Sequence, residues 1–263
     1  MKGRENIIKG AAPTGCGEKY IGSGQRYLKK GMGNCLQLLF PRRCPVCDEI
    51  VGTWGEKICI PCLKKLKYVA PPYCMKCGKP VEEGQEYCKD CNRYPHLFVC
   101  GRALYEYKSV APGIYRFKYG GRREYADFWG EELALYLGGF IHATGAQALI
   151  PVPLHPRRRR KRGYNQAQAL ANVVGRLTGV PVYRNYVSRI RDTAPLKALT
   201  PWERQNNLKK AFIIKQNDVK LEVAIIIDDI YTTGSTMDGV AMALLESGVR
   251  QVYFIALSCG AQL

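Results

Sequence analysis

Apolar residues along the chain form short unbroken runs as well as longer stretches with helical spacing. The clearest run, residues 223–227, contains no polar residue, which is typical of a strand buried on both faces of a parallel sheet. In residues 236–247 apolar side chains recur at positions i, i+3, i+4 and i+7, and Gly248 follows, which favours a helix with a glycine stop. These segments predict a strand, a short polar loop and a helix in succession.

The same two patterns recur upstream, where they predict further strands and helices. Strands are expected at residues 98–107, 148–152, 180–187, 211–214 and 252–257, and helices at 110–119, 124–140 and 164–177. Residues 1–35 are rich in glycine and lysine without a sustained apolar period, so we expect a flexible N-terminal extension there. Cys16 and Cys35 suggest no role of their own.

The composition is that of a globular protein with a large excess of positive charge. The 263 residues suit one large domain or two ordinary ones, and 46% hydrophobic residues suffice for a core. The formal net charge of +18 favours polyanionic partners such as nucleic acid, or phosphate-rich small ligands, although a basic protein without such a partner can carry the same charge. No apolar run reaches the ~18 residues of a membrane span, and no signal-peptide core is present, so a cytoplasmic location is expected.

Eight of the twelve cysteines fall into four C-x-x-C pairs. In a reducing compartment such pairs indicate metal ligands rather than disulfides, because two intervening residues bring both sulfurs to one side of a tight turn. A tetrahedral zinc needs four ligands, so four pairs supply two sites. An interleaved pairing and a sequential pairing are both compatible with the spacing. Sequential pairing would join Cys44, Cys47, Cys59 and Cys62 at one Zn²⁺ and Cys74, Cys77, Cys88 and Cys91 at the other.

Both zinc sites would be structural, since all four ligands come from the protein and no position is left open for a substrate. The cysteine segment has little else to fold around, so the metal would supply much of its folding energy. Each Zn(Cys)₄ unit carries two negative charges, which lowers the formal charge from +18 to +14 for two units. The protein therefore stays strongly basic with its zinc bound.

The apolar run at 223–227 leads into two carboxylates, Asp228 and Asp229, and then into a polar loop. Carboxylates can accept hydrogen bonds from a vicinal diol, while hydroxyl and N–H groups at a helix N-terminus hold a phosphate. The sequence therefore predicts a ribose 5-phosphate site, which is not a Walker loop because no lysine follows the glycine. Strand-end aspartates beside an ordinary loop are the alternative. The phosphate cradle would comprise Thr232, Thr233, Gly234, Ser235 and Thr236.

A run of six basic residues, 157–162, lies between a predicted strand end and a predicted helix. An open α/β sheet places its ligands at such positions, which favours phosphate binding over a merely solvated face. Gly163 permits a sharp backbone turn after the run. His155 could serve as a base, but a lone histidine beside a proline fits polar surface better.

Residues 189–207 mix proline, threonine and basic residues with little apolar periodicity. Loops of this length inside a compact domain are commonly functional or mobile. We interpret the segment as a lid that closes over a ligand and excludes water, with a plain surface excursion as the alternative.

The stretch VAIIIDDIYTTGST resembles the PRPP-binding motif of the type I phosphoribosyltransferases. That resemblance implies 5-phosphoribosyl-1-pyrophosphate (PRPP) as the ligand, with Asp228 and Asp229 on the ribose hydroxyls and residues 232–236 on the 5-phosphate. In an enzyme of this kind both carboxylates would also act in catalysis, and Mg²⁺ would accompany the pyrophosphate.

Five features in this order are similar to the ComF family of competence proteins: the cysteine pairs, KYGGRRE, PVPLHPRRRRKRGYNQ, RDTAPLKALTPWERQNNLKKAF and IIIDDIYTTGST. The resemblance implies an α/β fold, with a type I phosphoribosyltransferase-like parallel sheet at 98–263 after a double zinc-ribbon module at 36–97. It also implies a role in natural transformation, in which the protein interacts with single-stranded DNA. A DNA-uptake helicase or other competence proteins are further candidate partners.

The resemblance assigns two more regions around the ligand. A pyrophosphate loop would contain Pro153, Leu154, His155, Arg162, Gly163, Tyr164 and Asn165, and a flexible loop would contribute Arg191, Thr193, Lys197 and Arg204. One departure from the family's usual DDVLTTG is the pair Ile230 and Tyr231. Tyr231 would place a large side chain beside the ribose site, and mere variation of the loop is the alternative.

Two functions from different classes fit these residues, and we favour the second. As an enzyme, the protein would transfer ribose 5-phosphate from PRPP through an oxocarbenium-like transition state stabilised by positioned charges, but no residues identify an acceptor. As a binding protein, it would hold PRPP while a basic and aromatic surface binds single-stranded DNA. Candidates for that surface are Tyr115, Phe117, Tyr119, Arg122 and Arg123. Tyr115 and Phe117 also suit the core of an amphipathic helix.

Overall fold

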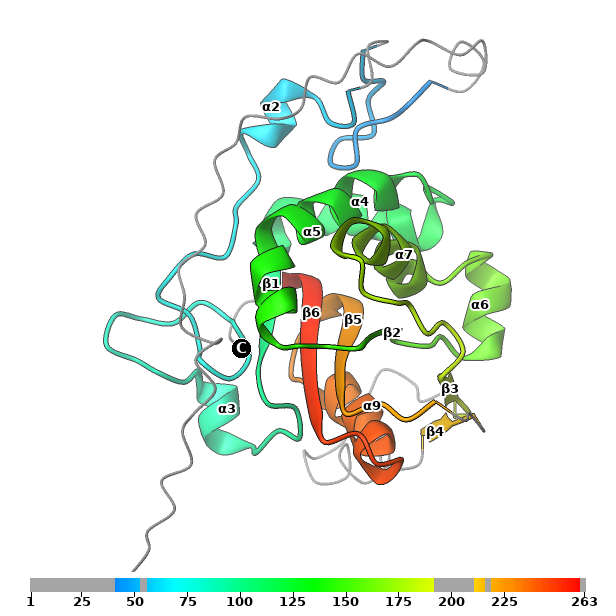
Figure 1. Cartoon of the computed structure of the whole chain (residues 1–263). Coiled ribbons are helices and arrows are strands. Elements are labelled where there is room, and N and C mark those ends of the chain that lie inside the picture. The colour runs from blue at the N-terminus through cyan, green and yellow to red at the C-terminus, as the bar shows by residue number, and fades with distance from the viewer. Residues whose placement is uncertain (1–40, 53–55, 192–210, 216–218, 261–263) are drawn as a thin grey trace, which may run out of the picture.

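The computed structural model describes residues 41–52, 56–191, 211–215 and 219–260. At its centre is a parallel sheet with the strand order β1-β6-β5-β2 (Figure 1). The unbroken apolar run makes β5 an interior strand between β6 and β2, as expected for a strand buried on both faces. The strands are β1 (Gly101–Glu106), β2 (Ala148–Pro151), β5 (Val223–Tyr231) and β6 (Gln251–Cys259). The predicted parallel α/β architecture is thereby confirmed.

Helices cover both faces of this sheet (Figure 1). One face carries α4 (Tyr107–Tyr119), α5 (Tyr125–Ala143) and α7 (Gln166–Thr178), and the other carries α9 (Ser235–Glu246). Successive residues of β5 alternate between the two layers, because side chains along a strand point to opposite faces. Ile225 and Ile227 pack in the cluster of the first three helices, whereas Ala224 and Ile226 pack in the cluster of α9.

The segment around residues 180–189 differs from the predicted strand. The strand predicted at 180–187 is reduced to a single bridge between Val182 and Leu149, because a turn at residues 184–185 interrupts it. The chain instead forms a small antiparallel pair, β3 (Val187–Arg189) with β4 (Phe212–Ile214).

The basic run, for which no element was predicted, forms the short helix α6 (Pro156–Arg162). Proline suits the first turn of a helix, where its missing N–H group is not needed. The helix ends at Gly163, whose φ of 78° is the left-handed conformation that glycine adopts readily. The sharp turn predicted at this glycine is confirmed.

The cysteine segment forms two lobes that pack on opposite faces of the sheet. The first ribbon, which holds the cysteines at 44–62 and helix α2 (Ile60–Leu63), adds Cys44 and Leu66 to the cluster of α5 and α7. The second ribbon, which holds the cysteines at 74–91 and helix α3 (Lys89–Arg93), adds Cys77 to the cluster of α9. Each ribbon therefore shares a hydrophobic core with the sheet.

A buried carboxyl group lies within the layer of α5. Glu132 is fully buried, and the hydroxyls of Tyr68 and Tyr105 both donate to its Oε2 at 2.6 Å. Its Oε1 has no hydrogen-bond partner among the described residues. Burial raises the pKa of Glu132 to about 8, so this carboxyl group is mostly protonated at neutral pH.

We expect the protein to lose stability through Glu132 as the pH rises from about 4.5 to about 8, by roughly 1.4 kcal/mol per pH unit. The reason is that the folded state retains a proton that the unfolded chain releases. Glu132→Gln cannot ionise and should remove this part of the slope when urea unfolding is followed across that range. The exposed Glu246→Gln serves as the control, and equal slopes in wild type and Glu132→Gln would contradict the prediction.

Candidate functional site

The two predicted carboxylates lie at the carboxyl end of β5, where an open parallel sheet binds its ligands. Asp229 is 6% exposed, and the Nζ of Lys118, at the end of α4, lies 2.9 Å from its Oδ1. Burial alone would lower the pKa of Lys118, but the charge of Asp229 outweighs burial and the pKa is raised. Lys118 is therefore a charged partner of the site, and the sequence did not single it out for that role.

Asp228 occupies the neighbouring position and titrates near neutrality. The backbone N–H of Asp229 donates to its Oδ1 at 2.8 Å. Burial, and then the negative charge of Asp229, raise the pKa of Asp228 to about 7, against the opposing charge of Lys118. The strand end thus combines one carboxyl group paired with a lysine and a second, Asp228, that gains or loses its proton at physiological pH.

The polar loop after β5 leads directly into α9. Gly234 precedes the helix with a φ of 83°, a left-handed conformation. The hydroxyls of Thr233 and Ser235 lie 2.9 Å apart, and Thr232 is exposed. No side chain caps α9, so the N–H groups of its first turn have no acceptor within the helix. Such a helix terminus favours an anion.

Tyr231 does not lie on the surface of this loop. It is the last residue of β5, its side chain is 1% exposed, and its ring stacks on Phe254 with the centroids 4.7 Å apart. Burial, and then the charges of Cys77 and Cys91, raise its pKa well above the usual range. Tyr231 is therefore a core side chain that packs toward the second ribbon, and its hydroxyl also lies close to Gly234 of the loop.

The segment assigned to pyrophosphate is held to the sheet and to α4 by its own polar side chains. The ring of His155 accepts from the N–H of Arg157 and caps α6. Asn165 accepts from the N–H of Ala167, caps α7, and donates to the carbonyl of Val152 at 2.9 Å. The hydroxyl of Tyr164 donates to the carbonyl of Phe117. Pro153 is buried, Leu154 is half-buried and Gly163 is exposed.

Arg162 joins the end of α6 to the end of α4. It donates to Gln166 Oε1 at 3.2 Å and to the hydroxyl of Tyr119 at 3.2 Å, and its guanidinium lies 5.0 Å from the centroid of the Tyr119 ring. The positive charge of Arg162 also acts to lower the pKa of Lys118. Arg162 therefore links the basic run to the end of α4, which also carries Lys118.

The aromatic residues of α4 divide between core and surface. Phe117 is fully buried, as considered from the sequence, but Tyr115 is 65% exposed, so a core position is wrong for it. The buried side of α4 contains Val110, Ile114 and Phe117 at helical spacing, and Tyr115 lies off that stripe. Tyr115 and Tyr119 lie side by side on the exposed face, with ring centroids 5.1 Å apart.

Other predicted site residues can be placed only in part. Arg191 is exposed, and its carbonyl accepts from Arg189 Nε at 3.2 Å. Thr193, Lys197 and Arg204 of the predicted flexible loop lie outside the described residues, as do Cys16, Cys35 and the predicted extension at 1–35.

The cysteines converge as two groups of four, which confirms the sequential pairing. Cys44, Cys47, Cys59 and Cys62 form one group, and Cys74, Cys77, Cys88 and Cys91 form the other, with all sulfurs of a group within 4.8 Å of one another. The Sγ atoms of Cys47 and Cys59 are 3.7 Å apart, and those of Cys77 and Cys88 are 3.6 Å apart. Tetrahedral Zn²⁺ with Zn–S bonds of about 2.3 Å requires roughly 3.8 Å between sulfurs. The thiolate sets therefore fit two closed structural zinc sites.

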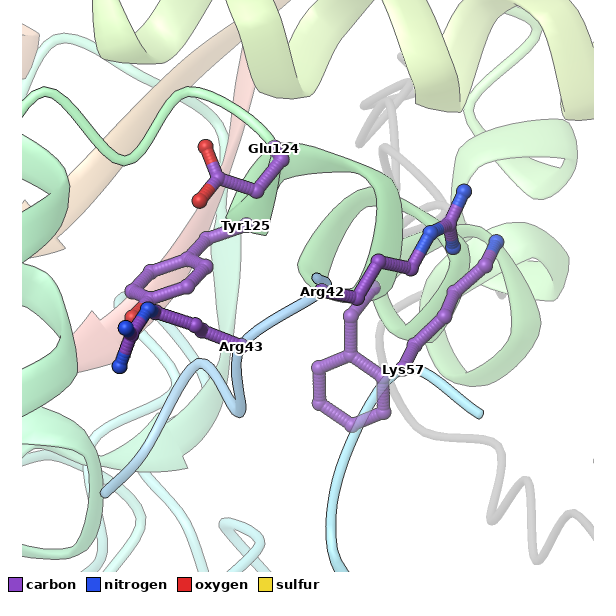
Figure 2. Close-up of a pocket in the computed structure, with 6 residues that line it drawn as sticks. Arg42, Arg43, Lys57, Glu124 and Tyr125 are labelled. Carbon is purple, nitrogen blue, oxygen red and sulfur yellow. The ribbon is translucent and has the colours of Figure 1, made fainter. Parts of the chain in front are cut away.

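A separate pocket lies between the first ribbon and the start of α5 (Figure 2). It is lined by Arg42, Arg43, Lys57, Glu124, Tyr125 and Phe128. Lys57 forms an ion pair with Glu131 at 2.5 Å, and Arg43 donates to the carbonyl of Asp48 at 2.9 Å. Lys57 and Arg43 are therefore already bound to oxygen atoms of the protein itself. None of the six residues that line this pocket belongs to β5 or α9.

Comparisons with a family model and with solved structures gave the following matches. A family model described as a double zinc ribbon domain matches residues 35–92. Among solved structures, a hypoxanthine phosphoribosyltransferase from Staphylococcus aureus matches with a TM-score of 0.33 and 14% identity, over 51% of this chain and 62% of that chain. A likeness of that size says nothing about shared sites. Within the described residues, no helix is long and apolar enough to cross a membrane.

Two curated relatives match almost their whole length. Competence protein F of Haemophilus influenzae is 29% identical over 227 residues, which cover 81% of this chain and 95% of that protein. The DNA utilization protein YhgH of Escherichia coli is 30% identical over 221 residues, which cover 82% of this chain and 96% of that protein. With its double zinc ribbon and parallel sheet, the chain belongs to the ComF family of competence proteins.

Proposed function

We propose that this protein binds PRPP at the end of β5 and interacts with single-stranded DNA during natural transformation. The observation that carries the proposal is the carboxylate pair Asp228 and Asp229, with Lys118 bound to it, beside an uncapped helix N-terminus. A diol and a phosphate joined by one sugar match these two neighbouring subsites. The names of the two relatives, a competence protein and a DNA utilization protein, support a role with DNA.

In this proposal each part of PRPP meets a different set of residues. Asp228 and Asp229 accept hydrogen bonds from the ribose hydroxyls. Thr232, Thr233, Ser235 and Thr236 supply hydroxyls, and residues 234–236 supply N–H groups, for the 5-phosphate. Mg²⁺ arrives with the pyrophosphate, whose charge the basic segment ending at Arg162 would balance.

An active phosphoribosyltransferase is the alternative function. Departure of pyrophosphate from C1 leaves an oxocarbenium-like centre, which nearby carboxylates stabilise by charge. Such an enzyme also needs an acceptor subsite, and among the described residues we assign none. The binding function is therefore the one that the residues support.

Isothermal titration with PRPP and Mg²⁺ tests this proposal, using protein whose content of two zinc ions per chain has been measured. We expect saturable binding of one PRPP per chain. Absence of binding in the zinc-loaded protein would overturn the PRPP part of the proposal. Release of pyrophosphate during the titration, in the presence of nucleobases or amines, would instead favour the transferase.

The surface proposed for single-stranded DNA is the exposed face of α4 together with the end of α6. Tyr115 and Tyr119 are 65% and 55% exposed, and Arg162 packs its guanidinium over Tyr119. Exposed rings can stack on bases of any sequence, and adjacent cations attract the backbone. The exposed arginines 157, 159 and 160 extend the positive charge from this face.

Tyr119→Ala should weaken binding of a fluorescent oligothymidylate by roughly 5- to 150-fold, because one stacked base contributes about 1–3 kcal/mol. Anisotropy titrations at several salt concentrations measure this effect and separate it from charge. Arg162→Ala should lower the slope of log K against log salt by about one phosphate contact, whereas Tyr119→Ala should leave that slope unchanged. Tyr87→Ala, an exposed tyrosine of the second ribbon, is the matched control. Wild-type affinity in Tyr119→Ala would exclude this face.

A further inference from the structure

The segment that leaves the second ribbon contacts the first turn of α9. His96 lies between the last cysteine pair and β1, and its side chain is 2% exposed. Its Nδ1 is 2.8 Å from Oδ2 of Asp238, and the backbone N–H of Leu97 donates to Oδ1 of the same carboxylate at 2.9 Å. Both oxygens of Asp238 are therefore occupied by two consecutive residues from a distant part of the chain.

Asp238 lies in the first turn of α9, where a carboxylate interacts favourably with the partial positive charge of the helix N-terminus. The N-cap residue is Gly234, which has no side chain, so no side chain caps α9. The carboxylate of Asp238 is bound to His96 and Leu97. The N–H groups that a phosphate would use are thus left without a competing internal acceptor.

The ring of His96 also packs directly against the loop. A Cβ atom on Gly234 would lie 2.6 Å from Cε1 of His96 and 2.9 Å from the hydroxyl of Tyr231. The ring of His96 also stacks on that of Phe98, with centroids 4.8 Å apart. Gly234 is thus confined between a histidine from the ribbon segment and a tyrosine from β5, which restricts the left-handed turn that starts α9.

The second ring nitrogen of His96 takes no part in the contact with Asp238. Its Nε2 is buried and has no hydrogen-bond partner among the described residues. A buried polar atom without a partner costs free energy, and such atoms are usually satisfied by protein, water or ligand. This one belongs to a ring that already touches the glycine of the loop.

We propose that His96 is a positioning residue for the phosphate loop, through which the second zinc ribbon holds residues 232–236 in their ligand-binding shape. The identity of the ligand rests on the proposed function, and the holding of the loop does not. The second ribbon would then support the phosphate loop from behind, and the contact between His96 and Asp238 would join the ribbon segment to α9.

The experiment compares His96→Ala, His96→Asn and Asp238→Ala with wild type. Hydrogen exchange of the amides at 232–237, measured without ligand, should accelerate at least tenfold in His96→Ala. Asparagine can place an amide nitrogen near the position of Nδ1, so His96→Asn should restore most of the protection. PRPP affinity should follow the same order, with about a tenfold loss in His96→Ala. His142→Ala, an exposed histidine at the end of α5, is the control.

A double variant separates positioning from general damage. If His96 acts through Asp238, then His96→Ala with Asp238→Ala should exchange no faster than either single variant, because both remove one shared interaction. Additive effects, or unchanged exchange in His96→Ala, would overturn the proposal. If His96→Ala loses zinc, Asp238→Ala decides the question, since it removes the contact from the α9 side and leaves the ribbon segment intact. Failure of wild type to bind PRPP would overturn the proposed function but leave the exchange result valid.

Discussion

Replacing Asp228 and Asp229 together by asparagine should reduce the affinity for PRPP by about 100-fold or more. Each ionised carboxylate that accepts from a ribose hydroxyl contributes roughly 1.5–3 kcal/mol, and an amide presents only one acceptor oxygen. Titration calorimetry with PRPP and Mg²⁺ measures the loss, and circular dichroism checks that the variant is folded. Wild-type affinity in a folded double variant would place the ligand elsewhere.

The two single variants should have different effects, Asp229→Asn on protein stability and Asp228→Asn on the pH dependence of PRPP affinity. Asp229→Asn leaves the ammonium of Lys118, 17% exposed, without its counter-charge, so it should also destabilise the protein. Asp228→Asn imitates the protonated carboxyl. Since the pKa of Asp228 is raised to about 7, and the ionised form is the better acceptor, wild-type affinity should increase between pH 6 and pH 8. Asp228→Asn should show only the smaller dependence that comes from the phosphates of the ligand.

Cys77→Ser should remove one of the two zinc ions and unfold the second ribbon. The free energy of structural zinc binding is roughly 10–16 kcal/mol, which is comparable to or larger than the whole stability of a typical domain. Cys77 is fully buried and lies in the cluster that contains Phe98, Tyr231 and α9, so the damage should reach the ligand loop. Metal analysis, thermal unfolding and PRPP titration of the same sample measure the three effects.

The matched variant is Cys47→Ser in the first ribbon, whose cluster is that of α5 and α7. It should also lose one zinc, but it should leave the exchange of the loop at 232–236 closer to wild type. Equal damage to the loop from both variants would mean that the two ribbons fold as one unit. Retention of two zinc ions in Cys77→Ser would contradict the assignment of that ligand.

Local patterns in the sequence predicted most of the elements and one part of the site. Two intervening residues fix the geometry of a C-x-x-C pair, and the run ending at Asp228 fixes a buried strand end, because both signals lie within a few residues. The helix at α6 was missed although its signals, a proline start and a glycine stop at Gly163, are present. The run was interpreted by its charge, so these helix signals were not used.

The contacts that complete the site could not be predicted in the same way. Lys118 and Asp229 are far apart in the sequence, as are His96 and Asp238, and each pair meets only because of the strand order. Periodicity also failed at Tyr115, because a helix can bury an apolar stripe that excludes one large aromatic residue. Such pairings depend on how the sheet is assembled, which local periodicity and motif spacing do not reveal.

The strand order has a consequence for how the chain acquires its structure during synthesis. Strand β6 is the last strand of the described chain, yet it lies between β1 and β5 in the interior of the sheet. The ribbons are local units that can take up zinc as soon as their cysteines leave the ribosome, whereas β1 and β5 have no partner in common until residues 251–259 appear. Metal loading of the ribbons can therefore precede completion of the sheet, and β1 lacks its parallel partner until residues 251–259 are inserted beside it.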